Sequence, residues 1–253
     1  MLNYIKSEFY RILRNKKLGI LIAICAFLMI AVVFVLKYFS TDSTFPYSNT
    51  MFSLRNVYMQ MDFILIIVVV FSAFMHDNEE KYQTIKHSIA FGVHRGTIYI
   101  GRFLVQAALS IMIYVVLVGI FTILSFALLN HANANELESL IRVSIGSFTC
   151  LLTSLAITHL FLMNTTSQTS AFTGTFAVVV ILPSICKILG QKVELMQRIS
   201  ELFPINIVAY NGPLVLVNGN ELLAVSKSLF LGALWLAGAL ILGNIQFSKK
   251  EIK

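Results

Sequence analysis

The sequence predicts an all-α integral membrane protein with six transmembrane helices. Of its 253 residues, 57% are hydrophobic and 12% are charged, and the mean hydropathy is +0.81. A soluble domain carries about 25% charged residues, so this chain lacks the polar side chains needed to cover a water-facing surface. Apolar runs such as Ile64–Val70 and Ala177–Leu182 do not alternate with polar residues as the strands of a membrane barrel do. Helices are the remaining way to cross the bilayer.

Six apolar stretches approach the length of about 20 residues that crosses about 30 Å of hydrocarbon. They lie near Leu18–Phe39, Val57–Met75, Phe103–Leu129, Leu140–Met163, Ala171–Leu189 and Leu222–Phe247. The third stretch is overlong, so we expect it to tilt or protrude. No linker or repeat divides the chain, which predicts a single six-span permease domain over residues 1–253.

The N-terminal residues 1–17 predict an amphipathic helix in the headgroup layer. Leu2, Ile5 and Phe9 recur at helical spacing, while basic residues such as Arg11 face elsewhere. A solvated leader helix is the alternative. The apolar run that follows is longer than that of a cleavable signal peptide and ends without a small-residue cleavage site, so we expect it to remain as a span.

The distribution of basic residues predicts that both termini face the cytoplasm. Twelve of the 19 lysines and arginines lie at the two ends of the chain or in residues 76–102, where they place the net charge of +7 on one side of the membrane. The membrane topology and the anionic lipid headgroups account for this positive charge, so we expect no nucleic-acid partner. We expect a multi-pass protein of the bacterial cytoplasmic membrane with both termini inside.

On the opposite side, residues 190–221 predict helices at the outer surface between the fifth and sixth spans. Val193, Met196 and Ile199 alternate with charged residues as in an amphipathic helix, which we expect Pro204 to close. The following stretch Ile205–Val217 is too short and interrupted to span, which favours a re-entrant or interfacial hairpin. A lid packed on its own spans is the alternative.

Within the spans, few side chains indicate chemistry. The three cysteines lack metal-ligand or disulfide spacing, and the sequence contains no GxxxxGK[ST] nucleotide loop, HExxH or GxSxG. We therefore predict no catalytic, cofactor or metal residues. His159 and Asp62 are candidates for a transport pathway, because ionisable groups at membrane depth are often functional. A helix-to-helix hydrogen bond for His159 and an interfacial position for Asp62 are the structural alternatives.

Residues 76–102 form a charged, amphipathic segment between the second and third spans. Ile85, Ile89 and Val93 recur every four residues and so share a helical face, with Lys86 placed elsewhere. We expect a coupling helix under the membrane, joined to both spans, so that a push on it moves both. A solvated loop with no partner is the alternative.

This segment resembles the cytoplasmic loop of type-2 ABC exporter permeases. The matching positions are Glu80, Thr84, Ile85, Lys86, Ile89, Arg95 and Ile98. Gln83, His94 and Arg102 stand where the family has glycine, serine and lysine. The six spans, the basic N-terminal helix and the long outer segment also agree with that family, so the resemblance covers the full length.

The resemblance implies a permease that works as a pair, usually a homodimer, with two copies of a separate ABC ATPase that binds ATP and Mg²⁺. The residues implied in coupling to the ATPase are Glu79, Glu80, Thr84, Ile85, Lys86, Ile89 and Arg95. Ser170 and Gly174, four residues apart, could bring two fifth spans together.

For the cargo, the resemblance and the apolar spans favour export of an amphipathic peptide, a toxin or an antimicrobial. The alternative within transport is an immunity or resistance permease for a bacteriocin or hydrophobic antibiotic. The alternative of another class is a membrane sensor or scaffold without transport.

Overall fold

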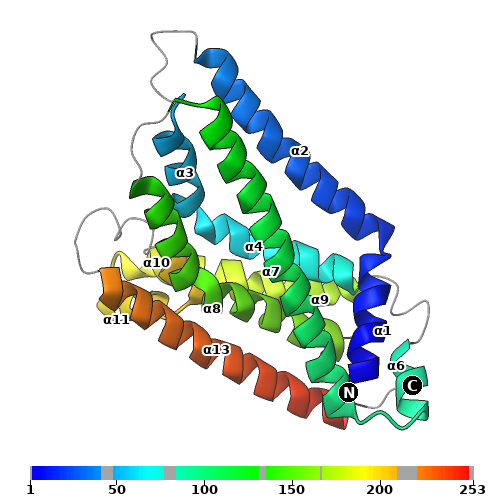
Figure 1. The fold of residues 1–253 in the computed structure, drawn as a ribbon. Coiled ribbons are helices and arrows are strands. Elements are labelled where there is room, and N and C mark those ends of the chain that lie inside the picture. Colours follow the sequence, from blue (N-terminus) through cyan, green and yellow to red (C-terminus); the bar gives the residue numbers. More distant parts are fainter. Residues whose placement is uncertain are drawn as a thin grey trace.

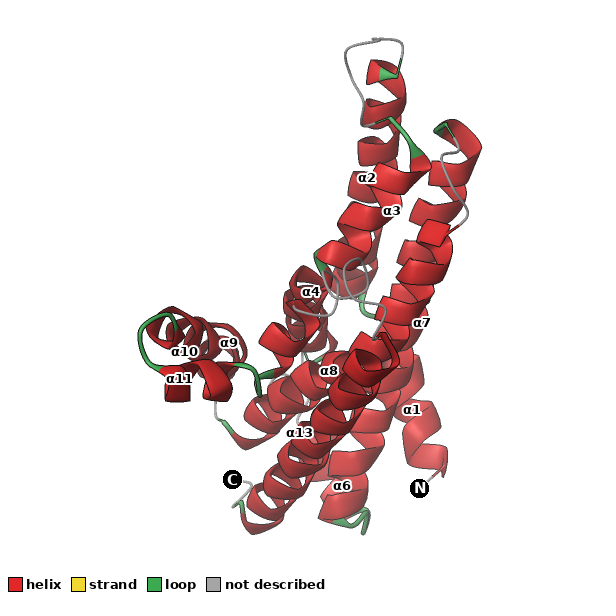
Figure 2. Cartoon of the chain, turned by 90° about the vertical axis from the view of Figure 1, so that its left-hand side faces the viewer, coloured by secondary structure: helices red, strands yellow, loops and turns green. Residues whose placement is uncertain are grey.

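The computed structural model describes residues 2–40, 48–76, 84–130, 135–165, 167–209 and 221–250, and these form helices with no strand among them (Figure 2). Five helical stretches are long and apolar enough to cross a membrane, and a bent pair of helices makes a sixth. The predicted all-α class is confirmed, and the predicted six spans are matched if the bent pair counts as one span.

The helices follow one another in the predicted order (Figure 1). The N-terminal helix α1 (Leu2–Leu13) precedes the first span α2 (Lys16–Phe39), and Asn15 between them caps α2 by accepting a hydrogen bond from the Lys17 amide. The other long helices are α7 (Arg95–Leu128), α8 (Asn135–Asn164) and α13 (Glu221–Lys249).

The second span is broken, which makes the predicted continuous helix Val57–Met75 wrong. Helix α3 (Thr50–Met59) and helix α4 (Met61–Met75) meet at Gln60 with a bend of 62°. The backbone of Gln60 leaves the helical region, and Asp62 lies in the first turn of α4, where a carboxylate stabilises a helix start. Because α4 has 15 residues and is about 22 Å long, it is too short to cross the hydrocarbon alone.

The third span begins earlier than predicted. Helix α7 starts at Arg95 rather than Phe103, so the last part of the expected coupling segment forms the first turns of this helix. Its 34 residues reach about 51 Å, which exceeds the hydrocarbon thickness and agrees with an overlong span.

The fifth span is continuous but contains one wide turn. Helix α9 (Gln168–Phe176) passes through a π-helical turn, η1 (Ala177–Ile181), into α10 (Leu182–Gly190). Pro183 has no amide hydrogen, so one backbone hydrogen bond of the helix is missing here. A π-helical turn is a common way to accommodate such a missing bond.

Beyond the fifth span, the predicted outer helix is present as α11 (Glu194–Ser200). Pro204 does not close that helix but begins a further helical stretch at residues 204–209, which makes this detail of the prediction wrong. The remainder of the predicted hairpin, from residue 210 onward, lies outside the described residues.

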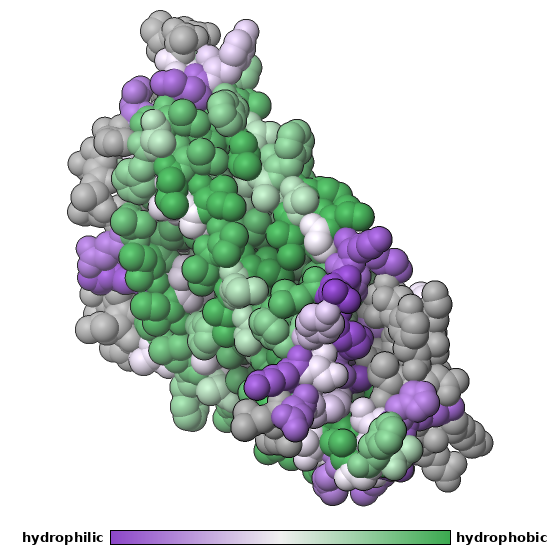
Figure 3. Space-filling view, turned by 45° about the vertical axis from the view of Figure 1, so that its right-hand side comes forward, coloured by the Kyte–Doolittle hydropathy of each residue, from purple (hydrophilic) through white to green (hydrophobic). Residues whose placement is uncertain are grey.

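Apolar side chains cover the middle of the bundle and hydrophilic ones gather at its extremities (Figure 3). One extremity holds α1, the short helix α6 (Thr84–Ala90), the start of α7 and the last turns of α8 and α13. We call it the basic end, because Arg11, Lys86, Arg95 and Lys250 all belong to it. The N-terminal helix α1 and the end of the last helix α13 both reach this extremity (Figure 1).

Candidate coupling site at the basic end

At the basic end, basic side chains join the ends of three long helices. Arg95, the first residue of α7, donates from Nη1 to the carbonyl oxygens of Ser248 and Lys250, at 2.9 and 2.7 Å. Lys250 in turn donates from Nζ to the carbonyl oxygens of Met163 and Thr165, at 3.0 and 3.1 Å. The last carbonyls of a helix have no partner within it, so these bonds cap the C-terminal ends of α13 and α8. Partial burial lowers the pKa of Lys250.

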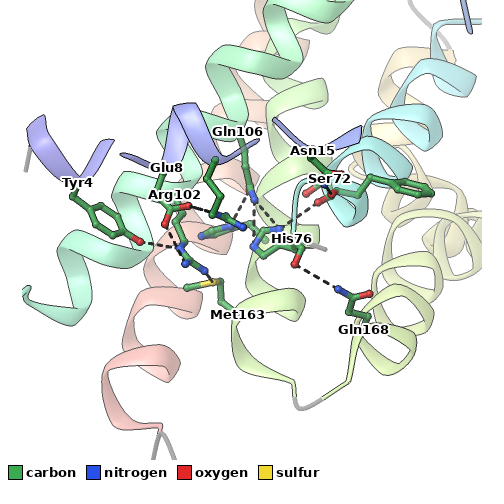
Figure 4. Close-up of polar contacts among 12 residues, drawn as sticks. Tyr4, Glu8, Asn15, Ser72, His76, Arg102, Gln106, Met163 and Gln168 are labelled. Carbon is green, nitrogen blue, oxygen red and sulfur yellow. Dashed lines mark hydrogen bonds and ion pairs between the residues drawn. The ribbon is translucent and has the colours of Figure 1, made fainter. Parts of the chain in front are cut away.

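A buried ion pair fixes α1 against α7 (Figure 4). Arg102 Nη2 lies 3.2 Å from Glu8 Oε1, and the two residues are only 2% and 4% exposed. Arg102 Nε also donates to the Tyr4 hydroxyl at 2.8 Å, and Arg11 Nη2 donates to Glu8 Oε2 at 2.7 Å. A buried charge needs such partners, since removing it from water is unfavourable. The N-terminal helix is therefore bonded to the third span and not merely laid on a membrane surface.

Behind this ion pair, a second polar cluster joins α4, α7 and α8. The Gln106 side chain lies between two imidazoles, with its Nε2 2.7 Å from His76 Nδ1 and its Oε1 3.0 Å from His159 Nδ1. His159 Nε2 donates to the Tyr99 carbonyl at 3.0 Å. All three side chains are buried, and His76 stands directly after α4. Burial and then the charge of Arg102 lower the pKa of His76 to about 3, so it is neutral at physiological pH.

Asn15, which lies between α1 and α2, connects these two helices to the C-terminal end of α4. Its Nδ2 donates to the Phe74 carbonyl at 2.8 Å, near the C-terminal end of α4, while its Oδ1 caps α2 (Figure 4). A movement of α1 is thereby linked to both of the first two spans.

Helix α6 lies against these joined helix ends. Ile85, Ile89 and Val93 pack on a small core that includes Tyr99 and Phe247, so the predicted apolar face exists and is covered by the chain's own helices. Val93 lies beyond the end of α6, which makes the expectation of one helix through all three positions wrong.

The turn after α6 presents a different apolar group. Phe91 is 87% exposed, beside Gly92 with a φ of 80°, a left-handed conformation that favours glycine. His94 then caps α7 by accepting a hydrogen bond from the Gly96 amide. This turn therefore presents an aromatic ring to the outside on a segment that is itself firmly attached.

The structure brings part of the predicted coupling set together. Ile85, Ile89 and Arg95 meet at the basic end, and Lys86 is half-buried on α6. Thr84 begins α6, and Glu79 and Glu80 lie outside the described residues. The sequence interpretation missed Phe91, Glu8, Gln106 and His76. Gln106 had a usable signal, since an amide within an apolar span needs a buried partner.

Three other sites predicted from the sequence, the two pathway candidates and the dimer contact, make contacts within the chain. His159 makes the helix-to-helix hydrogen bonds that the structural alternative expected, and Asp62 is half-buried at the start of α4. A side chain at Gly174 would begin 2.8 Å from the Phe161 ring of α8, so this glycine packs within the chain. Ser170 is exposed, and its amide donates to the hydroxyl oxygen of Ser167, which caps α9. A contact between fifth spans of two copies stays a prediction.

The described residues contain no group of three or more His, Cys, Asp or Glu side chains that could hold a metal ion. The spans, the capped helix ends and the short peripheral helix together define a polytopic membrane protein whose helices are joined at one end.

The family described as ABC-2 family transporter protein matches residues 4–184, which is well over half of the chain. The chain therefore belongs to the ABC-2 transporter family and is the permease subunit of an ABC transporter, which works with an ABC ATPase subunit. A comparison with curated proteins gives no match.

Proposed function

We propose that this permease exports an amphipathic peptide, a toxin or an antimicrobial, across the bacterial cytoplasmic membrane. In this proposal two copies of the chain form a homodimer and two ATPase subunits bind ATP and Mg²⁺. The basic end faces the cytoplasm, because lysine and arginine are retained on that side. The ATPase therefore approaches the surface formed by α6 and by the turn between α6 and α7.

The observation that carries the proposal is the exposure of Phe91 on this surface. An aromatic ring that is 87% exposed at a polar end of the molecule is unfavourable in water and is typical of an anchor that fills a partner's pocket. The predicted apolar face of α6 is already used within the chain, so docking falls to this turn and to the polar side of α6.

A force on this turn has a direct path to the spans. Arg95 starts α7 and bonds the end of α13, and Lys250 continues the contact to the end of α8. Arg102, two turns further along α7, holds α1 through Glu8. Movement of α6 thus displaces four helices together, which suits a coupling element that alternates the spans between two arrangements.

The nature of the cargo is supported by the apolar walls of the crevices between the spans. One crevice of about 390 Å³ lies between α7 and α8, and another of about 50 Å³ lies between α2, α4 and α7. Both are lined almost wholly by aliphatic and aromatic side chains, with only serine and tyrosine hydroxyls among them. Such walls suit a peptide with an apolar face and do not suit a sugar or an ion.

The experiment is to purify the permease with a co-expressed ABC ATPase and reconstitute the complex in lipid vesicles. Helical amphipathic peptides, lipophilic drugs and sugars are then titrated while ATP hydrolysis is measured. We expect copurification and a saturable stimulation by peptides. Failure of the ATPase to bind contradicts the coupling site, and stimulation by drugs or sugars alone contradicts the peptide cargo.

A further inference from the structure

Helix α1 packs against the chain with one face and leaves the opposite face exposed. Glu8 and Ile12, four residues apart, are buried. Lys6, Tyr10 and Leu13 follow one another at spacings of four and three residues, so they share the other face, and all three are exposed. This second face therefore meets whatever surrounds the protein at the basic end.

The exposed face of α1 and the start of α2 carry positive charge that no neighbouring carboxylate offsets. The exposed cations there are Lys6, Arg14, Lys16 and Lys17. Among the described side chains of α1, α2 and the rest of the basic end, Glu8 is the single carboxylate, and it is buried between two arginines. The charge of this surface favours an anionic partner.

The positive surface continues directly into the lipid-facing side of the first span. Lys16, Ile20, Ile24 and Phe27 recur every three or four residues and so share one face of α2. The three apolar side chains are strongly exposed on a helix that is apolar enough to cross the membrane. Figure 3 shows hydrophilic side chains lying directly beside the apolar surface of the spans. A partner that carries an anionic group next to a long apolar chain matches this arrangement.

An aromatic ring stands beside these cations. The guanidinium of Arg14 lies over the Tyr10 ring, 4.7 Å from its centre, on the last turn of α1 and the residue that follows it. Such stacking is attractive, and it keeps Arg14 on the exposed side of α1, two residues before Lys16. Tyrosine is enriched at the depth where lipid headgroups meet the hydrocarbon.

We propose that Tyr10, Arg14 and Lys16 bind the headgroup of an anionic phospholipid, with one acyl chain along the exposed apolar face of α2. A free phosphate would leave that apolar face unused. Because Glu8 joins α1 to α7 and Asn15 joins the same region to α4, the bound lipid holds the joined helix ends at the membrane surface. The inference takes only the cytoplasmic orientation of the basic end from the proposed function, and it adds a lipid partner.

The test uses the purified permease in an uncharged detergent, without ATPase or cargo. Phosphatidylglycerol and phosphatidylcholine with the same photoreactive acyl chain are titrated, and the adducts are mapped by mass spectrometry. We expect saturable labelling of residues 20–27 by phosphatidylglycerol at concentrations where phosphatidylcholine gives little. The double variant Arg14→Gln, Lys16→Gln should lower the affinity for phosphatidylglycerol about thirtyfold, since each such cation contributes about fivefold.

Two matched variants separate a local site from a general effect of charge. Arg14→Lys, Lys16→Arg keeps both charges and should retain the affinity. Lys187→Gln, Lys192→Gln removes two exposed cations at the other end of the fifth span and should also bind phosphatidylglycerol as the unaltered protein does. Raising the ionic strength should weaken the labelling of the unaltered protein, a measurement that needs no variant.

Three results overturn the proposal: equal labelling by the two lipids, adducts outside α1 and α2, or equal loss of affinity in the Lys187 and Lys192 variant. Displacement of the lipid by glycerol phosphate at equal concentration would assign the surface to a free anion, and displacement by a soluble acidic peptide would assign it to a protein partner. Either result also overturns the lipid site. Since neither ATPase nor cargo is present, a failure here leaves the proposed function untouched, and a failure of peptide export leaves a positive lipid result standing.

Discussion

The two sides of helix α8 are packed in opposite ways. Toward α13 the helices approach so closely that a side chain at Gly232 would overlap Thr149 Oγ1. Thr149 and Thr153 donate to the carbonyl oxygens of Ser228 and Gly232 of α13, at 3.2 and 2.8 Å. Toward α7 the same helix borders the larger crevice. The Tyr114 hydroxyl of α7 reaches across this crevice to Ser144 of α8.

This difference indicates which helices move together. Small residues and hydroxyls that bond across helices give close packing in a membrane, where the hydrophobic effect does not press helices together. We infer that α8 and α13 form one rigid pair. Helix α7 is joined to that pair at the basic end, through Arg95 and Gln106, and is loosely packed at mid-depth. A displacement of α7 at the basic end would therefore change the crevice more than the α8–α13 contact.

The largest effect is expected from breaking the ion pair that fixes α7 at the basic end. Arg102→Met removes one of the two cations that pair with the buried Glu8 carboxylate and leaves only Arg11 beside it, which should destabilise the protein by about 3 kcal/mol. Thermal unfolding in detergent measures this. The control is Arg142→Met, which removes an exposed ion pair with Glu138 and should change stability by less than about 1 kcal/mol.

The double variant Glu8→Gln, Arg102→Met sharpens this test. It removes both charges, so it should be more stable than Arg102→Met alone. If the double variant is no better than the single one, the loss comes from packing and not from a carboxylate that has lost one of its two cations.

A smaller loss of stability is expected from opening the close contact between α8 and α13. Gly232→Leu places a side chain against the Thr149 side chain and the Cys150 amide nitrogen and should destabilise the protein by roughly 1–3 kcal/mol, as overpacking does. Gly238, on the same helix, has nothing within 4 Å of the corresponding position, so Gly238→Leu should be tolerated. Equal effects of the two substitutions would show that the pair is not rigid there.

The third prediction concerns docking and leaves the fold unchanged. Phe91→Ala should weaken ATPase association by about 2 kcal/mol, close to thirtyfold, with no loss of thermal stability because the ring makes little contact within the chain. Titration of the ATPase onto immobilised permease measures the affinity. Phe27→Ala on α2 is the control, since its ring is also exposed but lies within a span. Normal affinity in Phe91→Ala contradicts the anchor.

The sequence predicted the helical class and most of the spans, because long apolar runs depend on composition alone. It misplaced features that depend on local backbone or on tertiary contacts. The bend at Gln60 carries no proline or glycine to announce it, and the early start of α7 depends on a histidine cap at His94. Neither feature has a strong signal in a single sequence.

The candidate coupling site was likewise predicted in part and missed in part. The periodicity of Ile85, Ile89 and Val93 correctly indicated an apolar face, yet periodicity does not say whether such a face meets a partner or the chain's own core. The guanidinium of Arg95 caps the end of α13, a contact within the chain that the sequence did not predict, and its contact with the ATPase stays a prediction. The Glu8–Arg102 pair joins residues far apart in the chain, so no local pattern predicts it.

The smallest effect is expected at the bridge across the crevice. Ser144 Oγ donates to the Leu140 carbonyl at 2.7 Å, so the Tyr114 hydroxyl is the donor in the bond between α7 and α8. Hydrogen bonds between membrane helices contribute about 0.6 kcal/mol on average, and Tyr114→Phe should lower stability by about that amount. A double-mutant cycle with Ser144→Ala measures the coupling between the two hydroxyls. A coupling near zero would mean that apolar contact alone holds α7 against α8 at this depth, whereas a coupling of about 0.6 kcal/mol would show that the hydroxyl pair joins the two helices.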